Sequence, residues 1–184
     1  MKTQKFAESF NKIKIAEIQI NTSIEMLFEN KHPVSIHTVA SAGFRIVRDL
    51  AELKNIEEYI QIKDHIKTGM EKEFWKYINR PSNYFKHADK DPEKTFDGID
   101  EKVNEFTILW AIRIYRGLGG QLSVEMRGFL AWFMCLYPDL MTDGSLKALI
   151  QTNMNQVNTN NFSRAELLSV GNISVKNMRG SLPT

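Results

Sequence analysis

The sequence predicts an all-α protein, and three observations support this fold class. Apolar residues recur at three-, four- and seven-residue steps over most of the chain, as they do on one face of an amphipathic helix. Residues typical of helix starts and stops separate these stretches. No stretch shows the strict alternation of apolar and polar residues that marks a half-buried strand. We therefore expect a bundle of four to five long helices with two short C-terminal helices.

The first helix is expected over about residues 6–28. Residues 30–33 end it, because proline disfavours helical geometry in the residue before it. A second helix follows, with Ser35 as its N-cap. Its run of small residues, 40–43, would let another backbone come close.

A third helix is expected over about residues 55–79. A capping box that starts at Asn55 would open it, and Pro81 would stop it because proline lacks a backbone donor. The fourth helix begins near Ile99, and the glycine-rich run 117–120 ends it.

The fifth helix is expected between Ser123, as its N-cap, and Pro138, and it is apolar on most sides. A short sixth helix is expected over about residues 146–154. The seventh begins with a capping box that starts at Ser163, and Gly171 is expected to end it.

Size and composition favour one domain, residues 1–171, followed by a mobile tail, residues 172–184, with little to bury. The formal net charge of +2 is too small to indicate a nucleic-acid partner by itself. Cys135 is the only cysteine, so we expect a reducing, cytoplasmic location. We expect no signal peptide and no membrane association, because no apolar run approaches the roughly 20 residues of a membrane span.

Several kinds of chemistry can be set aside from spacing alone. No histidines stand four residues apart around a glutamate, no Glu-x-x-His occurs and there are no cysteine pairs, so we expect neither a metal site nor a cofactor. The run 117–120 lacks the Gly-Lys-Ser/Thr ending of a phosphate loop. Cys135 lies in an apolar helix, where burial makes a thiol unreactive.

The stretch between Pro81 and Pro92 is the best candidate for a site. Cleavage of RNA without a metal needs an acid or base near neutral pH and a cation that stabilises the transition state. His87 suits the first role, and Arg80, directly before the stretch, suits the second. Between these two residues, Tyr84 or Phe85 could stack on a base, and Lys86 could contact a backbone phosphate.

His37 and Arg45 fall on or beside one line of the second helix. They could form an anion-binding flank of the same site. The pattern is also consistent with a solvated face that carries a partly buried imidazole, and we favour this second interpretation.

The pattern Arg80-x6-His87 in an all-helical chain resembles the HEPN superfamily. Its members are helical proteins of bacterial defence, toxin–antitoxin and RNA-processing systems, and many are metal-independent ribonucleases that act as dimers. The resemblance covers one motif and the general helical layout. It implies a homodimer in which Arg80 and His87 meet their symmetry mates. Pro81 stands where the family usually has a polar residue, a role that Asn83 would then take. The stretch 83–92 also resembles small bacterial proteins of unassigned function.

Two other interpretations stay open. In the first, Arg80 pairs with Asp89 or Asp91, Tyr84 anchors the segment in the core, and His87 satisfies backbone groups of an ordered turn. In the second, the protein is a non-enzymatic interaction module that takes a protein partner or a small anionic ligand. Our hypothesis is a cytoplasmic homodimer that binds or cleaves RNA, which leaves open whether the protein is an enzyme.

Overall fold

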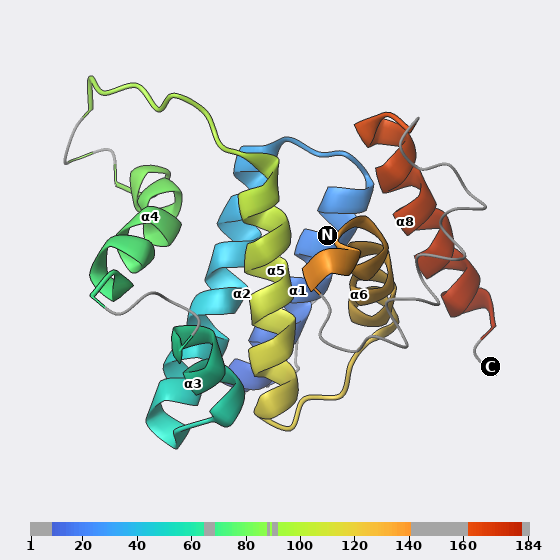
Figure 1. The fold of residues 1–184 in the computed structure, drawn as a ribbon, viewed down its shortest axis with the longest axis horizontal. Coiled ribbons are helices and arrows are strands. Elements are labelled where there is room, and N and C mark those ends of the chain that lie inside the picture. Colours follow the sequence, from blue (N-terminus) through green and yellow to red (C-terminus); the bar gives the residue numbers. More distant parts are fainter. Residues whose placement is uncertain (1–8, 65–68, 88, 90–91, 141–161, 182–184) are drawn as a thin grey trace, which may run out of the picture.

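A computed structural model describes residues 9–64, 69–87, 89, 92–140 and 162–181. Within these ranges the fold is all-helical, which confirms the predicted class (Figure 1). The elements are α1 (Lys12–Phe28), α2 (Pro33–Lys54), α3 (Glu57–Asp64), α4 (Glu71–Tyr84), α5 (Glu101–Gly117), α6 (Val124–Leu136), the short 3-10 turn η1 (Pro138–Leu140) and α8 (Arg164–Gly180). None of the described helices has both the length and the apolar character needed to cross a membrane.

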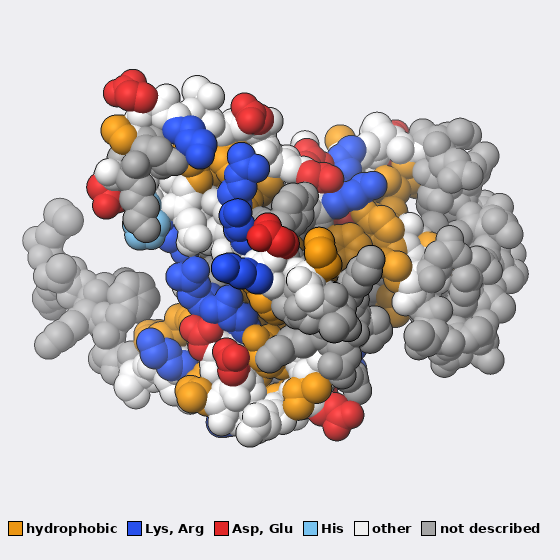
Figure 2. Space-filling view, turned by 60° about the vertical axis from the view of Figure 1, so that its left-hand side comes forward, with side chains coloured by type: hydrophobic (Ala, Val, Ile, Leu, Met, Phe, Trp, Pro, Cys, Tyr) orange, Lys and Arg blue, Asp and Glu red, His pale blue; other side chains and the backbone are white. Residues whose placement is uncertain are grey.

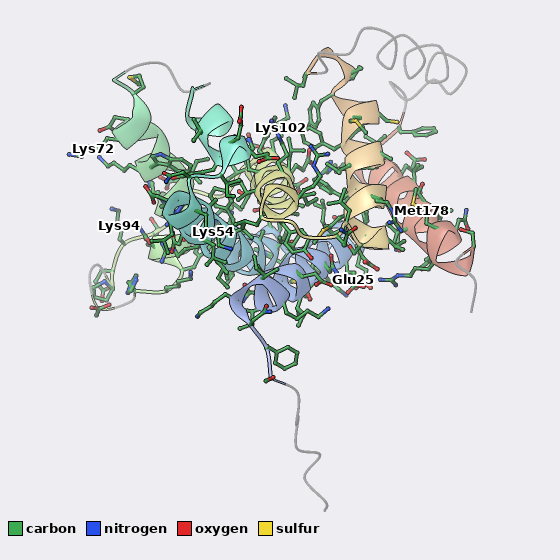
Figure 3. All side chains as sticks on the ribbon, turned by 90° about the horizontal axis from the view of Figure 1, so that it is seen from below. Glu25, Lys54, Lys72, Lys94, Lys102 and Met178 are labelled. Carbon is green, nitrogen blue, oxygen red and sulfur yellow. The ribbon has the colours of Figure 1, made fainter. Side chains whose placement is uncertain are left out.

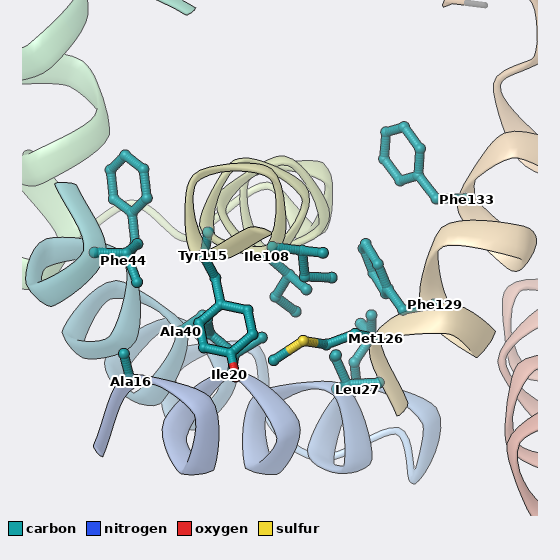
Figure 4. Packing of buried hydrophobic residues seen from close by; sticks show 14 of the residues in the cluster. Ala16, Ile20, Leu27, Ala40, Phe44, Ile108, Tyr115, Met126, Phe129 and Phe133 are labelled. Atoms are coloured by element: carbon teal, nitrogen blue, oxygen red, sulfur yellow. The ribbon is translucent and has the colours of Figure 1, made fainter. Parts of the chain in front are cut away.

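Helices α1, α2 and α5 form the centre of the molecule, with α3 and α4 on one side and α6 and α8 on the other (Figure 1). The core between them is apolar, and Ile20, Ile108 and Phe129 are completely buried (Figure 4). Gly43 sits where α1 crosses α2, and a Cβ atom there would lie 3.2 Å from a side-chain carbon of Ile20. The run 40–43 therefore does admit a close neighbouring helix, as predicted.

The first two helices begin at residues other than the predicted ones. Asn11 is the N-cap of α1, so this helix begins later than the expected residue 6. His32 caps α2, and Ser35 does not, because Pro33 occupies the first helical position. Proline suits that position, since its fixed φ is already helical and its missing N–H would have no partner there.

The predicted third helix is in fact two helices, α3 and α4. Asn55 is the C-cap of α2 in the left-handed conformation (φ 51°), so the expected capping box there is wrong. Gly69 has a φ of 84°, which cannot continue a helix. Helix α4 then continues through Pro81, where a stop was expected, to Tyr84.

The starts and stops of α5 and α6 agree with the sequence. Helix α5 ends at Gly117, and Gly119 follows with a positive φ of 87°. The Ser123 hydroxyl caps α6 by accepting a hydrogen bond from the Met126 N–H (3.1 Å). The short helix expected over residues 146–154 lies outside the described residues.

Helix α8 begins at the predicted capping box, in which Ser163 N–H donates to the Glu166 carboxylate (2.7 Å). Its predicted end at Gly171 is wrong. Gly171 is buried because it packs directly against the Phe28 ring, and the helix continues to Gly180 with Val175 buried. Residues 172–180 are therefore part of a long helix that packs on α1 and α6, not a tail with little to bury.

Candidate functional site

Helix α4 presents two different faces. Ile78, Pro81 and Ser82 are buried, on the side that packs against α2. Exposed polar side chains follow at steps of four and three residues, a spacing that keeps them on one side of the helix: Lys76, Arg80 and Asn83. The amphipathic register of α4 therefore places Arg80 on this exposed side, whereas His87 follows the end of the helix, where helical spacing no longer applies.

Pro81 does not break α4, because the helix continues past it for three more residues, to Tyr84. A proline there costs the helix one backbone hydrogen bond, and its buried ring contributes apolar packing. The last turn is still closed, since Phe85 N–H donates to the Pro81 carbonyl (2.9 Å). Arg80 consequently lies inside the last turn of α4 and not at a broken end.

Five residues of α4 and its C-terminal turn line an open pocket: Lys76, Arg80, Asn83, Tyr84 and His87. Lys94 and Phe96, from the segment that leads to α5, complete it. We call this the basic pocket, and its volume is about 280 Å³. Of the described residues that line it, none is acidic. Lys and Arg side chains form a band on this side of the molecule (Figure 2).

An aromatic contact holds Arg80 in the basic pocket. The guanidinium carbon lies 5.5 Å from the centroid of the Phe96 ring, within the range of a cation–π interaction. Tyr84 stacks obliquely on Phe96 with 5.1 Å between ring centroids, and its hydroxyl donates to the Lys94 carbonyl. These contacts attach the segment before α5 to α4, and Lys94 lies on the α4 side of the molecule (Figure 3).

Asp89 and Asp91 are the two acidic residues that the sequence offered as ion-pair partners of Arg80. Among the described residues, no carboxylate forms an ion pair with Arg80. Asp89 instead lies 4.0 Å from Nδ1 of His87, whose side chain is 48% exposed. Asp91 lies outside the described residues. The guanidinium and the imidazole therefore both reach solvent in one pocket.

His37 is not part of this site, contrary to the expectation that it binds substrate. It is completely buried, with Nδ1 2.9 Å from Asn104 Oδ1 and Nε2 3.0 Å from the Ser41 hydroxyl. Asn104 donates its amide N–H to the Pro33 carbonyl (3.0 Å), so its oxygen faces His37 and accepts the Nδ1 proton. Burial lowers the pKa of His37 and keeps the ring neutral.

His37 nevertheless contacts an aromatic side chain next to the site. Its ring meets the Phe85 ring edge-on, with 6.0 Å between centroids. Phe85 in turn packs against Phe96 at 5.3 Å. The buried histidine is thus a structural contact beneath the aromatic side chains of the site.

Lys86 and Arg45 are exposed, and neither lines the basic pocket. Partial burial, and after it the nearby Arg45 guanidinium, lowers the pKa of Lys86. The two positive charges therefore lie near each other, and neither belongs to the basic pocket.

Three lining residues were not predicted from the sequence: Lys76, Lys94 and Phe96. Lys76 stands four residues before Arg80. A prediction in which the helix continued through Pro81 would have placed Lys76 on the same helix face as Arg80. Lys94 and Phe96 have no such local signal, because only the folding of their segment onto α4 brings them to the site.

No protein-family model matches this chain, and no curated protein and no solved structure matches it significantly. Likeness to known proteins therefore neither supports nor opposes the HEPN resemblance. Within the described part of the chain, no three His, Cys, Asp or Glu side chains are placed to hold a metal ion. The basic pocket places the Arg80 guanidinium and the His87 imidazole together. These groups can bind a phosphate and exchange a proton beside it.

Proposed function

We propose that the basic pocket binds the phosphate backbone of RNA and that His87 acts there as an acid or base in RNA cleavage without a metal. One observation carries this proposal. Arg80 and His87 line one open pocket with Lys76 and Lys94, and no described lining residue is acidic. A site with this charge favours anions, and a guanidinium can donate two parallel hydrogen bonds to one phosphate.

The proposed roles follow from the chemistry of each group. Arg80, oriented by the Phe96 ring, would hold two phosphate oxygens and stabilise the charge that builds up on them. Lys94 would add positive potential around the phosphate, and so would Lys76, whose ammonium lies 3.9 Å from the exposed Glu73 carboxylate. Cleavage forms a bond from the ribose 2′-oxygen to phosphorus and breaks the bond to the 5′-oxygen, which leaves a cyclic phosphate. The His87 imidazole would accept the 2′-hydroxyl proton or, when protonated, donate one to the 5′-oxygen.

We also propose a homodimer, as the HEPN resemblance implies. Each cleavage needs one proton accepted and one donated, whereas a single imidazole can start in only one of these states. A second copy of the pocket would supply the other histidine. Light scattering at micromolar concentration should give the mass of two chains, and a monomer mass would contradict this part of the proposal.

RNA binding is tested by fluorescence anisotropy of a labelled single-stranded RNA over a range of salt concentrations. Arg80→Ala should weaken binding about five- to tenfold and make the salt dependence shallower by about 0.7 in log–log slope for each phosphate that the variant no longer neutralises. Arg116→Ala is the matched control, because it removes an exposed arginine at the far end of α5. If both variants bound RNA equally weakly, Arg80 would contribute only non-specific electrostatic attraction, and the proposed phosphate site would be wrong.

Cleavage is tested separately with mixed RNA in EDTA, using wild type and His87→Gln prepared in the same way. Losing an acid or base should slow cleavage at least ~100-fold, and a DNA strand of the same sequence should stay intact because it lacks the 2′-hydroxyl. Equal cleavage by both proteins would remove His87 from the mechanism. RNA binding without cleavage would instead favour the non-enzymatic alternative.

A further inference from the structure

A second hollow adjoins the basic pocket. It is lined by residues 32–34, 84–85, 94–96 and 98–99, has a volume of about 610 Å³, and is called here the aromatic groove. Tyr84, Lys94 and Phe96 line both hollows, so the two are adjacent. Whatever occupies the groove lies directly beside an anion held in the basic pocket.

The groove differs from the basic pocket in chemistry. Apart from the shared residues, its walls include the apolar side chains of Val34, Phe85 and Ile99. Phe96 lies between the hollows and contacts Phe85 with 5.3 Å between ring centroids. Phe85 rests on the buried His37, which holds the aromatic wall in place. The groove therefore has a positioned aromatic wall and the volume for a flat, weakly polar ring system.

We propose that the aromatic groove receives an unpaired nucleobase of the RNA whose phosphate occupies the basic pocket, an inference that rests on the proposed function. In a nucleotide the phosphate and the base are separated only by the ribose, and here the cationic and aromatic sites are adjacent and share three lining residues. Aromatic side chains stack on all four bases, so the groove selects an unpaired base without distinguishing which base it is.

This arrangement makes the site selective for single strands. A base inside a duplex is already stacked and paired, so it can enter the groove only after it is unpaired. A duplex therefore engages the basic pocket through its phosphates alone. Single-stranded RNA engages both hollows, and each base that stacks on protein adds to its affinity.

The test compares three RNA ligands of equal phosphate number on the full chain at one salt concentration: a single strand, the same strand with abasic riboses, and a duplex. Anisotropy should show the single strand binding about tenfold more tightly than either other ligand, as the stacking of one or two bases provides. These three measurements need no variant, so misfolding cannot obscure them.

Thr95 offers the matched variants, because it is exposed and lines the groove but not the basic pocket. Thr95→Trp should fill the groove and reduce the affinity for the single strand to that for the abasic strand, which should itself stay unchanged. Thr95→Ala should keep the preference.

The outcomes separate this inference from the proposed function. Equal binding of the base-containing and abasic strands would overturn the groove as a base site and leave phosphate binding standing. A uniform loss of affinity for all three ligands in Thr95→Trp would also overturn it, since the groove would then serve the phosphates. Binding of none of the RNAs by wild type would overturn both proposals.

Discussion

Two arginines at opposite sides of the molecule have similar aromatic partners and different ionic ones. The Arg80 guanidinium lies 5.5 Å from the Phe96 ring, and that of Arg164 lies 5.4 Å from the Trp132 ring. Arg164 also forms ion pairs with Glu101 and Glu105, whereas no described carboxylate pairs with Arg80. The aromatic ring orients both cations, and the presence of carboxylates decides whether the charge holds the fold together or is available to a ligand.

One of the two carboxylates that pair with Arg164 is buried in the core. Glu105 is only 1% exposed, and the Tyr137 hydroxyl donates to its carboxylate (2.8 Å). Burial, together with this hydrogen bond to a carboxylate, raises the pKa of Tyr137 well above its usual value. Arg164, Glu105 and Tyr137 thus tie α8 to α5 and to the end of α6, and removing Arg164 or Tyr137 takes one partner away from the buried Glu105 carboxylate.

The largest difference between the two regions should appear in stability. Arg164→Ala leaves the Glu105 carboxylate buried without its cation, and should lower the free energy of unfolding by about 3 kcal/mol. Arg80→Ala removes an exposed cation with no described ion pair, and should cost less than about 1 kcal/mol. Urea unfolding monitored by circular dichroism measures both. Comparable destabilisation in the two variants would break the distinction drawn between them.

Removing one tyrosine hydroxyl from each region compares the stability of the two regions with a smaller substitution. Tyr137→Phe removes a hydrogen bond to the buried Glu105 carboxylate, and should cost about 1.5 kcal/mol in the same unfolding experiment. Tyr84→Phe removes a hydrogen bond to a backbone carbonyl that water can replace, and should cost about 0.5 kcal/mol. A larger effect at Tyr84 would mean that the wall of the basic pocket carries more of the stability than its exposure indicates.

The smallest effect should be a pH dependence from His37, beneath the site. Burial lowers its pKa from the ordinary value of 6.5, so the unfolded chain takes up a proton at a higher pH than the folded chain. Its contribution is present above pH 6.5, and stability should fall as the pH drops below 6.5 towards the lowered pKa. The slope of unfolding free energy between pH 7 and about 5.5 should become flatter in His37→Asn. An unchanged slope would contradict a buried, neutral His37.

Local signals in the sequence predicted much of the fold. The caps at Ser123 and Ser163 were correct because a cap is a hydrogen bond between residues two or three positions apart. The expected helix ends at Pro81 and Gly171 were wrong because packing between distant parts of the chain decided them. The buried ring of Pro81 in α4 and the packing of Gly171 against Phe28 are tertiary features that no local rule includes.

For the candidate site, the sequence by itself determined which chemical groups were present between α4 and α5 and that Arg80 and His87 stand near a helix end. The tertiary structure alone decided which of those groups share a pocket. It brought Lys94 and Phe96 back onto α4 and buried His37 against Asn104 of α5. The physical reason is that residue type and spacing are local properties, whereas exposure, pairing and the walls of a pocket depend on segments that meet only when the chain folds.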